Sequence, residues 1–224
     1  LVLAVLGLGV LLAAGALVAS RSDRSSGRED WVGTVLGIEQ TKPEITLTDT
    51  AGDRFDLADS TDGQLTLLMF GYTNCPDICP ISVATLASAL DSMDPAVARK
   101  VRLVFVTADP ERDTPERLRT FLDQFDERFI GLTGTLDELD AAQDAANVPI
   151  AVRDEPDEDG SYAVGHATQM IAYQSDGVAR IVYPFGTREG DWVRDLPRLV
   201  AGEEPAAWPR PARAEARPSP SWSG

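Results

Sequence analysis

The only two cysteines of this chain stand four residues apart, directly after a run of apolar residues, and this placement constrains the fold strongly. A continuous apolar run such as 65–72 is typical of a strand buried on both faces of a sheet. Apolar residues at helical spacing follow over 78–93 and predict a helix. The fold must therefore place Cys75 and Cys79 where a central strand ends and a helix begins. The junction reads Gly71-Tyr72-Thr73-Asn74-Cys75-Pro76-Asp77-Ile78-Cys79-Pro80.

Strands and helices are expected to alternate along the rest of the chain, which indicates an α/β fold with parallel strands and right-handed crossovers. A hairpin turn at Asp176-Gly177 adds antiparallel strands near the end. A dithiol that opens the helix after a central strand is the thioredoxin-like arrangement, so we expect a thioredoxin-like central sheet flanked by helices. The remaining strands are expected at 32–38, 44–48, 54–57, 101–107, 129–132, 148–152, 168–173 and 178–183. The remaining helices are expected after Thr114 to 125, after Thr135 to 146, and at 189–201.

The two cysteines have a spacing that suits joint chemistry. Residues four apart on a helix share one face, so Cys75 and Cys79 would converge on one metal ion or on each other. The helix N-terminus favours a thiolate at Cys75. Two thiolates with an imidazole suit Cu(I) above all, and the same thiols can instead cycle to a disulfide. A purely structural disulfide is disfavoured, because so short a closed loop gains little chain entropy.

His166 is the only histidine of the chain and precedes the strand expected at 168–173. Imidazole is a common metal ligand, which makes His166 the candidate third donor. Its loop would lie either at the cysteines' end of the sheet or at the opposite end, and the sequence leaves both positions open. A neutral ring is required for binding, so metal affinity should fall at acid pH.

The two ends of the chain differ from its centre in composition. Residues 1–19 carry no charged side chain and are mostly Leu, Val and Ala, which is long enough to cross a membrane. A retained single-pass anchor is favoured over a cleaved signal segment, whose apolar region is usually shorter. Residues 20–30 are expected to form a flexible tether, 31–202 one domain and 203–224 a disordered tail. The domain is then expected on the extracytoplasmic side of the cell membrane, where a disulfide can persist.

The formal net charge of −16 excludes a nucleic-acid-binding protein, which needs a basic surface. Acidic residues are densest at 154–159. This run is interpreted as a solvated loop, because its spacing does not match a calcium-binding loop.

Three segments carry a family resemblance: Phe70-Gly71-Tyr72-Thr73-Asn74-Cys75-Pro76-Asp77-Ile78-Cys79-Pro80, Thr107-Ala108-Asp109-Pro110-Glu111-Arg112-Asp113-Thr114-Pro115-Glu116, and Tyr162-Ala163-Val164-Gly165-His166-Ala167-Thr168. Together they resemble the Sco/SenC family of copper chaperones, which are membrane-anchored and thioredoxin-like. The resemblance spans roughly residues 40–200 and implies a copper ion held by Cys75, Cys79 and His166. Members usually carry Asp before the histidine, where this chain has Gly165.

By this resemblance, the chain delivers copper to the dinuclear copper centre of cytochrome c oxidase subunit II, or reduces the cysteines of that centre. Cys75 and Cys79 would be the redox dithiol in the second role. The main alternative is an extracytoplasmic thiol–disulfide oxidoreductase without a metal. It would have C-x-x-C and a proline before the facing strand, but the spacing here is C-x-x-x-C and no proline occurs between Gly160 and Tyr173. A peroxiredoxin-like peroxidase and a binding domain with a disulfide are further alternatives.

Overall fold

Strand β4 (Leu65–Gly71), buried along its whole length, forms the centre of the computed structural model, which describes residues 31–158 and 160–205. It pairs in parallel with β5 (Val101–Thr107) and antiparallel with β9 (Met170–Tyr173). The other strands of this sheet are β1 (Thr34–Thr41), β2 (Thr46–Asp49), β3 (Arg54–Asp56), β6 (Ile130–Thr133) and β10 (Val178–Tyr183). The eight strands run in the order β1-β10-β9-β4-β5-β6-β2-β3.

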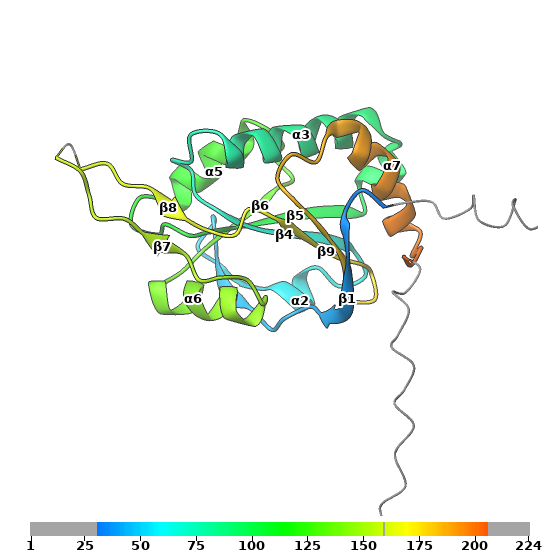
Figure 1. The fold of residues 1–224 in the computed structure, drawn as a ribbon, viewed down its shortest axis with the longest axis horizontal. Coiled ribbons are helices and arrows are strands. Elements are labelled where there is room, and N and C mark those ends of the chain that lie inside the picture. Colours follow the sequence, from blue (N-terminus) through cyan, green and yellow to red (C-terminus); the bar gives the residue numbers. More distant parts are fainter. Residues whose placement is uncertain (1–30, 159, 206–224) are drawn as a thin grey trace, which may run out of the picture. The chain divides into compact units, whose positions relative to one another are not determined.

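Helices cover both faces of the sheet (Figure 1). One face carries α3 (Ile78–Ser92), α5 (Pro115–Asp123) and α7 (Glu189–Val200), and the other carries α2 (Leu57–Ser60) and α6 (Leu136–Ala145). The short helix α4 (Pro95–Ala98) follows α3. Strand side chains alternate between the two layers. Leu68 and Phe70 share a buried cluster with Leu139 of α6, whereas the ring of Phe105 lies 5.7 Å from that of Phe121 on α5.

Most of the predicted elements are confirmed. Strands β5 and β10 have the expected bounds, and α3 and α7 each end one residue before the expected end. Thr114 caps α5 by accepting a hydrogen bond from the Arg117 N–H, and Thr135 forms the expected capping box of α6 with Glu138. The expected parallel arrangement holds for β4, β5 and β6, and the C-terminal hairpin adds antiparallel strands.

The strand predicted at 148–152 is wrong. Most of this segment is irregular because its backbone is bound to the end of α6. The Val148 N–H donates to the Gln143 carbonyl, and the Ala151 N–H donates to the Gln143 side chain. Only β7 (Val152–Arg153) is a strand, and it pairs with β8 (Val164–Gly165) in a separate two-stranded sheet.

The strand predicted at 54–57 ends one residue earlier than expected, at Asp56 of β3. Leu57, expected at the end of a strand, instead begins α2, because the Asp56 carboxylate accepts from the Asp59 N–H and starts a helical turn. The helices α2 and α4 were not predicted, since each is a single turn with too few residues to show a helical period.

The expected membrane segment at 1–19 and the tether at 20–30 lie outside the described residues, as does most of the expected tail at 203–224. Across residues 31–158 and 160–205, no helix combines the length and apolar character that a membrane crossing needs.

Candidate metal centre

The two cysteines flank the start of α3. The chain leaves β4 at Gly71, turns, and enters the helix behind Asp77, whose carboxylate accepts from the Ile78 N–H. This turn brings the Cys75 sulfur to the helix N-terminus, 3.4 Å from the backbone nitrogen of Cys79, which donates to it. Neither cysteine is in a disulfide, and Cys75 is 7% and Cys79 0% exposed. Their placement at a strand–helix junction is as predicted.

The structure also settles which end of the sheet carries His166. Strand β9 runs antiparallel to β4, with Met170 opposite Met69, so the segment before β9 lies at the end of β4 where the cysteines are. The Nε2 atom of His166 is 3.7 Å from the Cys79 sulfur. The Nδ1 atom of the ring lies 2.8 Å from the Ala167 carbonyl oxygen. A hydrogen bond donated by Nδ1–H leaves Nε2 with a free lone pair that faces the thiols.

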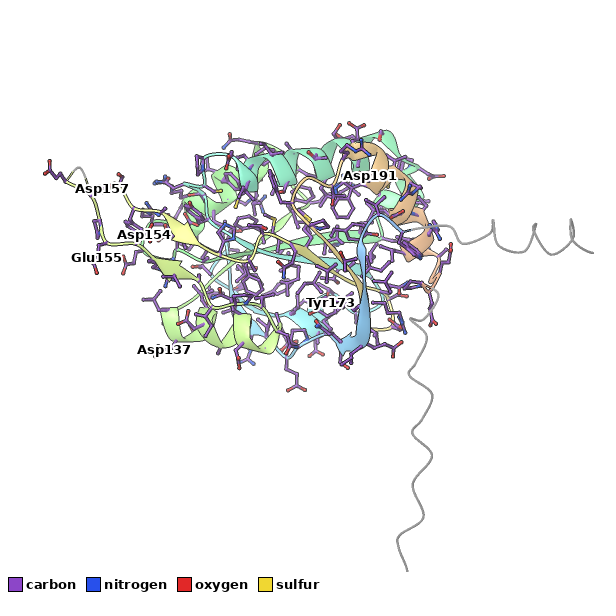
Figure 2. All side chains as sticks on the ribbon, in the orientation of Figure 1. Asp137, Asp154, Glu155, Asp157, Tyr173 and Asp191 are labelled. Atoms are coloured by element: carbon purple, nitrogen blue, oxygen red, sulfur yellow. The ribbon has the colours of Figure 1, made fainter. Side chains whose placement is uncertain are left out.

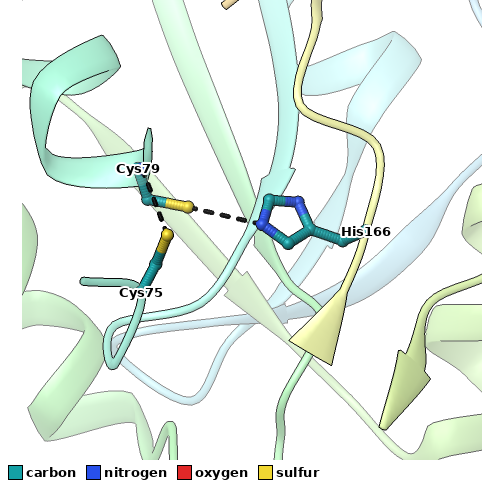
Figure 3. A group of neighbouring side chains, drawn as sticks. All are labelled: Cys75, Cys79 and His166. Carbon is teal, nitrogen blue, oxygen red and sulfur yellow. Dashed lines mark hydrogen bonds between the residues drawn. The ribbon is translucent and has the colours of Figure 1, made fainter. Parts of the chain in front are cut away.

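The three predicted donors therefore converge, although they come from two distant parts of the sequence (Figure 3). The two sulfur atoms and the imidazole nitrogen all lie within 4.8 Å of one another. Over the described part of the chain, this is the one group of three or more His, Cys, Asp or Glu side chains close enough to hold a metal ion.

The two thiols differ in acidity. The pKa of Cys75 is lowered to about 5, first because the Cys79 thiol donates a hydrogen bond to its sulfur, and further by backbone N–H donors. The pKa of Cys79 is raised, because it is the donor in that bond and because it is buried. At neutral pH, the pair is thus one thiolate and one thiol.

Gly71 belongs to the motif around the cysteines, and its role in the site was not predicted from the sequence. A Cβ atom at Gly71 would lie 2.7 Å from the Phe105 ring and 2.8 Å from the Cys79 sulfur. A side chain there would displace the sulfur, so Gly71 makes room for it. A glycine within an apolar strand is the signal of such a close approach.

Tyr72 is a second residue whose role in the site was not predicted from the sequence. Its ring meets the His166 ring edge-on, with centroids 5.5 Å apart and planes at 85°. Tyr72 is buried, so its ring packs against one side of the imidazole and limits its movement in that direction.

A buried carboxylate holds the turn that carries Cys75. Asp113 is fully buried and accepts hydrogen bonds from the Thr73 N–H at 3.0 Å, the Thr73 hydroxyl at 2.5 Å and the Thr107 hydroxyl at 2.6 Å. It thus ties the turn after β4 to the end of β5. Burial raises the pKa of Asp113. Asp113 belongs to a family motif, but its contact with Thr73, 40 positions away, was not predicted from the sequence.

The acidic run does not form a site with the cysteines. Asp154, Glu155 and Asp157 lie along the projecting connection between β7 and β8, where Figure 2 labels them. These residues are exposed, in agreement with the expected solvated loop. Residue 159 lies outside the described residues.

The chain is similar to known proteins in sequence and in structure. A family model described as SCO1/SenC matches residues 36–201. A putative copper-binding protein of Stutzerimonas stutzeri is 30% identical over 169 residues, which cover 75% of this chain and 81% of that protein.

Two solved structures are similar throughout the domain. The copper-bound ScoI structure from Bradyrhizobium japonicum is 32% identical, with a TM-score of 0.64 over 72% of this chain and 99% of that chain. The solution structure of apo Sco1 from Thermus thermophilus is 26% identical, with a TM-score of 0.69 over 78% and 100% of the respective chains. The mixed α/β, thioredoxin-like fold expected from the sequence agrees with these structures.

Proposed function

Because this chain belongs to the SCO1/SenC family, we propose that it is a copper chaperone that binds one Cu(I) ion through Cys75, Cys79 and His166. The observation that carries this proposal is the convergence of two thiol sulfurs and an imidazole nitrogen within 4.8 Å. The recipient is proposed to be the dinuclear copper centre of cytochrome c oxidase subunit II.

The donor geometry fits a single soft ion. Bonds from zinc to sulfur and imidazole nitrogen are about 2.0–2.3 Å long, and with bonds of that length donors around one ion lie about 3.5–4 Å apart. The 3.7 Å between the Cys79 sulfur and His166 Nε2 is within that range. Thiolates and imidazole are donors that favour Cu(I) over hard cations. Burial of both cysteines also limits the access of water and oxidants to the ion.

The protonation states of the free site suit uptake of the ion. Cys75 is a thiolate at neutral pH, and His166 has Nδ1 at the Ala167 carbonyl and Nε2 directed at the thiols. Cys79 is protonated, so binding of Cu(I) releases the Cys79 proton. Transfer to a recipient reverses this step, and Cys79 takes up a proton as the ion leaves.

The location of the domain is part of the same proposal. Residues 1–19 would hold the protein in the cell membrane, with the domain on the extracytoplasmic side. The support is the uncharged, apolar composition of this segment. Protease added to cells stripped of their wall should cleave the domain; protection of the domain would contradict this location.

A second candidate function is thiol–disulfide exchange without a metal, and the low pKa of Cys75 favours it. The Cys75 thiolate would attack a substrate disulfide and release one substrate thiolate. Cys79 would then lose its proton and attack the Cys75 sulfur of the mixed disulfide. The second substrate thiolate would leave, so the substrate gains two electrons and the protein is left with a Cys75–Cys79 disulfide.

Titration of the reduced domain with Cu(I) against a competing chelator tests the first proposal. We expect one ion per chain, and X-ray absorption should report sulfur and imidazole ligands. Cys75→Ser and Cys79→Ser should abolish tight binding, and His166→Ala should weaken it. Met93→Leu removes a soft donor at the far end of α3 and is the control that should bind as tightly as the unaltered protein.

The recipient is tested by mixing the loaded chain with metal-free subunit II and analysing the copper content of each after separation. Transfer to subunit II is expected. Absence of sulfur ligands would overturn the site. If copper binds but does not pass to subunit II, the proposed recipient is wrong. If the reduced protein binds no Cu(I) but reduces the cysteines of subunit II, the second candidate replaces the first.

A further inference from the structure

His166 lies between β9, which the main sheet holds from Met170 onward, and the hairpin of β7 and β8, which the main sheet does not hold. His166 directly follows β8, and within the described residues β8 pairs only with β7. A two-stranded ribbon alone is marginally stable in water. On the N-terminal side of His166, contacts from outside the ribbon must therefore hold the chain in place.

Two arginines attach this hairpin to the loop after β5. Arg153, on β7, donates from Nη2 to the Ala108 carbonyl at 2.6 Å. Arg112, in that loop, donates from Nη1 to the Tyr162 carbonyl at 3.0 Å, two residues before β8. Both strands of the ribbon are thus tied to the segment next to Asp113.

Arg112 is the better connected of the two arginines. Its Nε donates to the Asp109 carboxylate at 2.5 Å, and Asp109 is fully buried. Tyr162 closes the ring of contacts, because its hydroxyl donates to the other Asp109 oxygen at 2.8 Å. The Arg112 guanidinium carbon also lies 3.5 Å from the centroid of the Tyr162 ring. Arg112, Asp109 and Tyr162 therefore each contact the other two, and we refer to them as the clamp.

The clamp reaches His166 by two routes. Along the backbone, Tyr162 is four residues before His166. Through side chains, the Arg112 guanidinium carbon is 5.8 Å from the centroid of the Tyr72 ring, and Tyr72 meets the His166 ring edge-on. A shift of the guanidinium would thus move both the strand that delivers His166 and the Tyr72 ring beside its imidazole.

We propose that the clamp of Arg112, Asp109 and Tyr162 positions His166, holding Nε2 toward the Cys79 sulfur before any ion arrives. Arg112 is a positioning residue, since it touches none of the three donors. Lysine cannot replace it, because only a planar guanidinium can donate to Asp109 and to the Tyr162 carbonyl while stacking on the ring. The consequence for metal affinity rests on the proposed function, whereas the consequence for the free imidazole does not.

The first test uses the metal-free, reduced protein. His166 is the only histidine, so nitrogen NMR of its imidazole is free of overlap. The unaltered domain should show a single Nδ1-protonated tautomer. Arg112→Lys should give a mixture of tautomers or broadened signals, and Tyr162→Phe, which keeps the ring but loses the bond to Asp109, should give a smaller change in the same direction.

Arg180→Lys is the matched control. Arg180 is as buried as Arg112, with 13% against 18% side-chain exposure, and it forms ion pairs with Glu39 and Asp176. It lies on β10 near the start of that strand, away from the His166 end of β9. Its replacement should lower thermal stability without changing the imidazole signals.

The second test measures Cu(I) affinity in a double-mutant cycle. Loss of a group that orients a metal ligand typically costs about 10–100-fold in affinity, and we expect at least about tenfold for Arg112→Lys. The same change in a His166→Ala background should have no further effect, because the clamp acts through the imidazole.

The two tests separate the clamp from the proposed function. The clamp is overturned if Arg112→Lys leaves the imidazole signals unchanged, or if it lowers Cu(I) affinity equally with and without His166. If the unaltered protein binds no Cu(I), the proposed function fails, and the imidazole signals still decide whether the clamp exists.

Discussion

Burial at Cys79 and hydrogen bonding at Cys75 give two identical side chains different chemistry. Cys79 is fully buried and donates a hydrogen bond to Cys75, whose thiolate also accepts from backbone N–H groups at the start of α3. The thiolate is the nucleophilic form of cysteine. Reactivity should therefore be concentrated at Cys75.

We expect iodoacetamide to alkylate Cys75 well before Cys79 in the reduced, metal-free protein at pH 6 to 7. The pKa of Cys75 is about 5, so its sulfur is ionised across this range, whereas Cys79 is both protonated and covered. Peptide mapping by mass spectrometry over time measures the two rates. Equal rates would contradict the assigned acidities. Added Cu(I) should protect both sulfurs.

Gly71→Ala should destabilise the domain by about 1–3 kcal/mol, because the new methyl group would overlap the Phe105 ring and the Cys79 sulfur. Urea unfolding of the reduced protein measures this change. Gly37→Ala on β1 is the control, because a Cβ atom there has no neighbour within 4 Å. Similar stabilities for the two variants would show that Gly71 is not needed to accommodate the sulfur.

At the scale of elements, the sequence predicted most of what local pattern controls. The buried runs of β4 and β5 and the caps of α5 and α6 depend on neighbouring residues, and all were found as expected. The convergence of Cys75 and Cys79 was predicted from helical spacing, but Cys75 lies before α3, and the turn ahead of Asp77 brings its sulfur to Cys79. The end of the sheet at which His166 lies could not be predicted. It depends on the direction of β9 relative to β4, and these two strands pair although they are far apart in the chain.

The wrong strand prediction at 148–152 also has its cause in a contact that the local pattern does not show. Its apolar residues resemble a strand, but the backbone donors of Val148 and Ala151 are satisfied by Gln143 instead of a neighbouring strand. A side chain eight residues away thus decides the local conformation, and no period in the sequence records it. The clamp was missed for a similar reason, since Arg112 and Tyr162 are separated by 50 positions.

Asp113→Asn should loosen the connection between the turn after β4 and the end of β5. An asparagine keeps the shape but replaces one accepting oxygen with a donor that faces Thr73 or Thr107, at a cost of about 1–3 kcal/mol. Hydrogen exchange at the Thr73 amide measures this loosening, and the amide should exchange faster in the variant. Asp195→Asn is the control, because Asp195 is also buried but accepts from Val32 and Tyr183. Unchanged protection of Thr73 in Asp113→Asn would contradict this role.

At the scale of the whole molecule, the thiols link stability to pH. The pKa of Cys75 falls from its ordinary value of 9.0 to about 5 on folding, so between these values the unfolded chain binds the proton and the folded chain does not. The contribution of Cys75 is complete above pH 9 and is lost as the pH falls toward 5. The raised pKa of Cys79 acts in the opposite sense, but only above pH 9, where the unfolded thiol ionises.

The free energy of unfolding of the reduced, metal-free domain should therefore rise with pH between 5 and 8.5 more steeply in the unaltered protein than in Cys75→Ser. Urea unfolding at several pH values gives both slopes, and their difference isolates Cys75 from the other titrating groups. Parallel curves would mean that the Cys75 thiol ionises equally in the folded and unfolded chains.

The antiparallel pairing of β9 with β4 also fixes an order of events during biosynthesis. Cys79 and His166 are 87 positions apart, and β9 is among the last strands made. A growing chain thus presents a bare dithiol long before the imidazole exists, and only the finished domain offers all three donors. An ion held by the complete set favours the folded chain by mass action. In a copper-starved cell the protein would then be correctly built yet more easily degraded, so its level would fall with the metal supply.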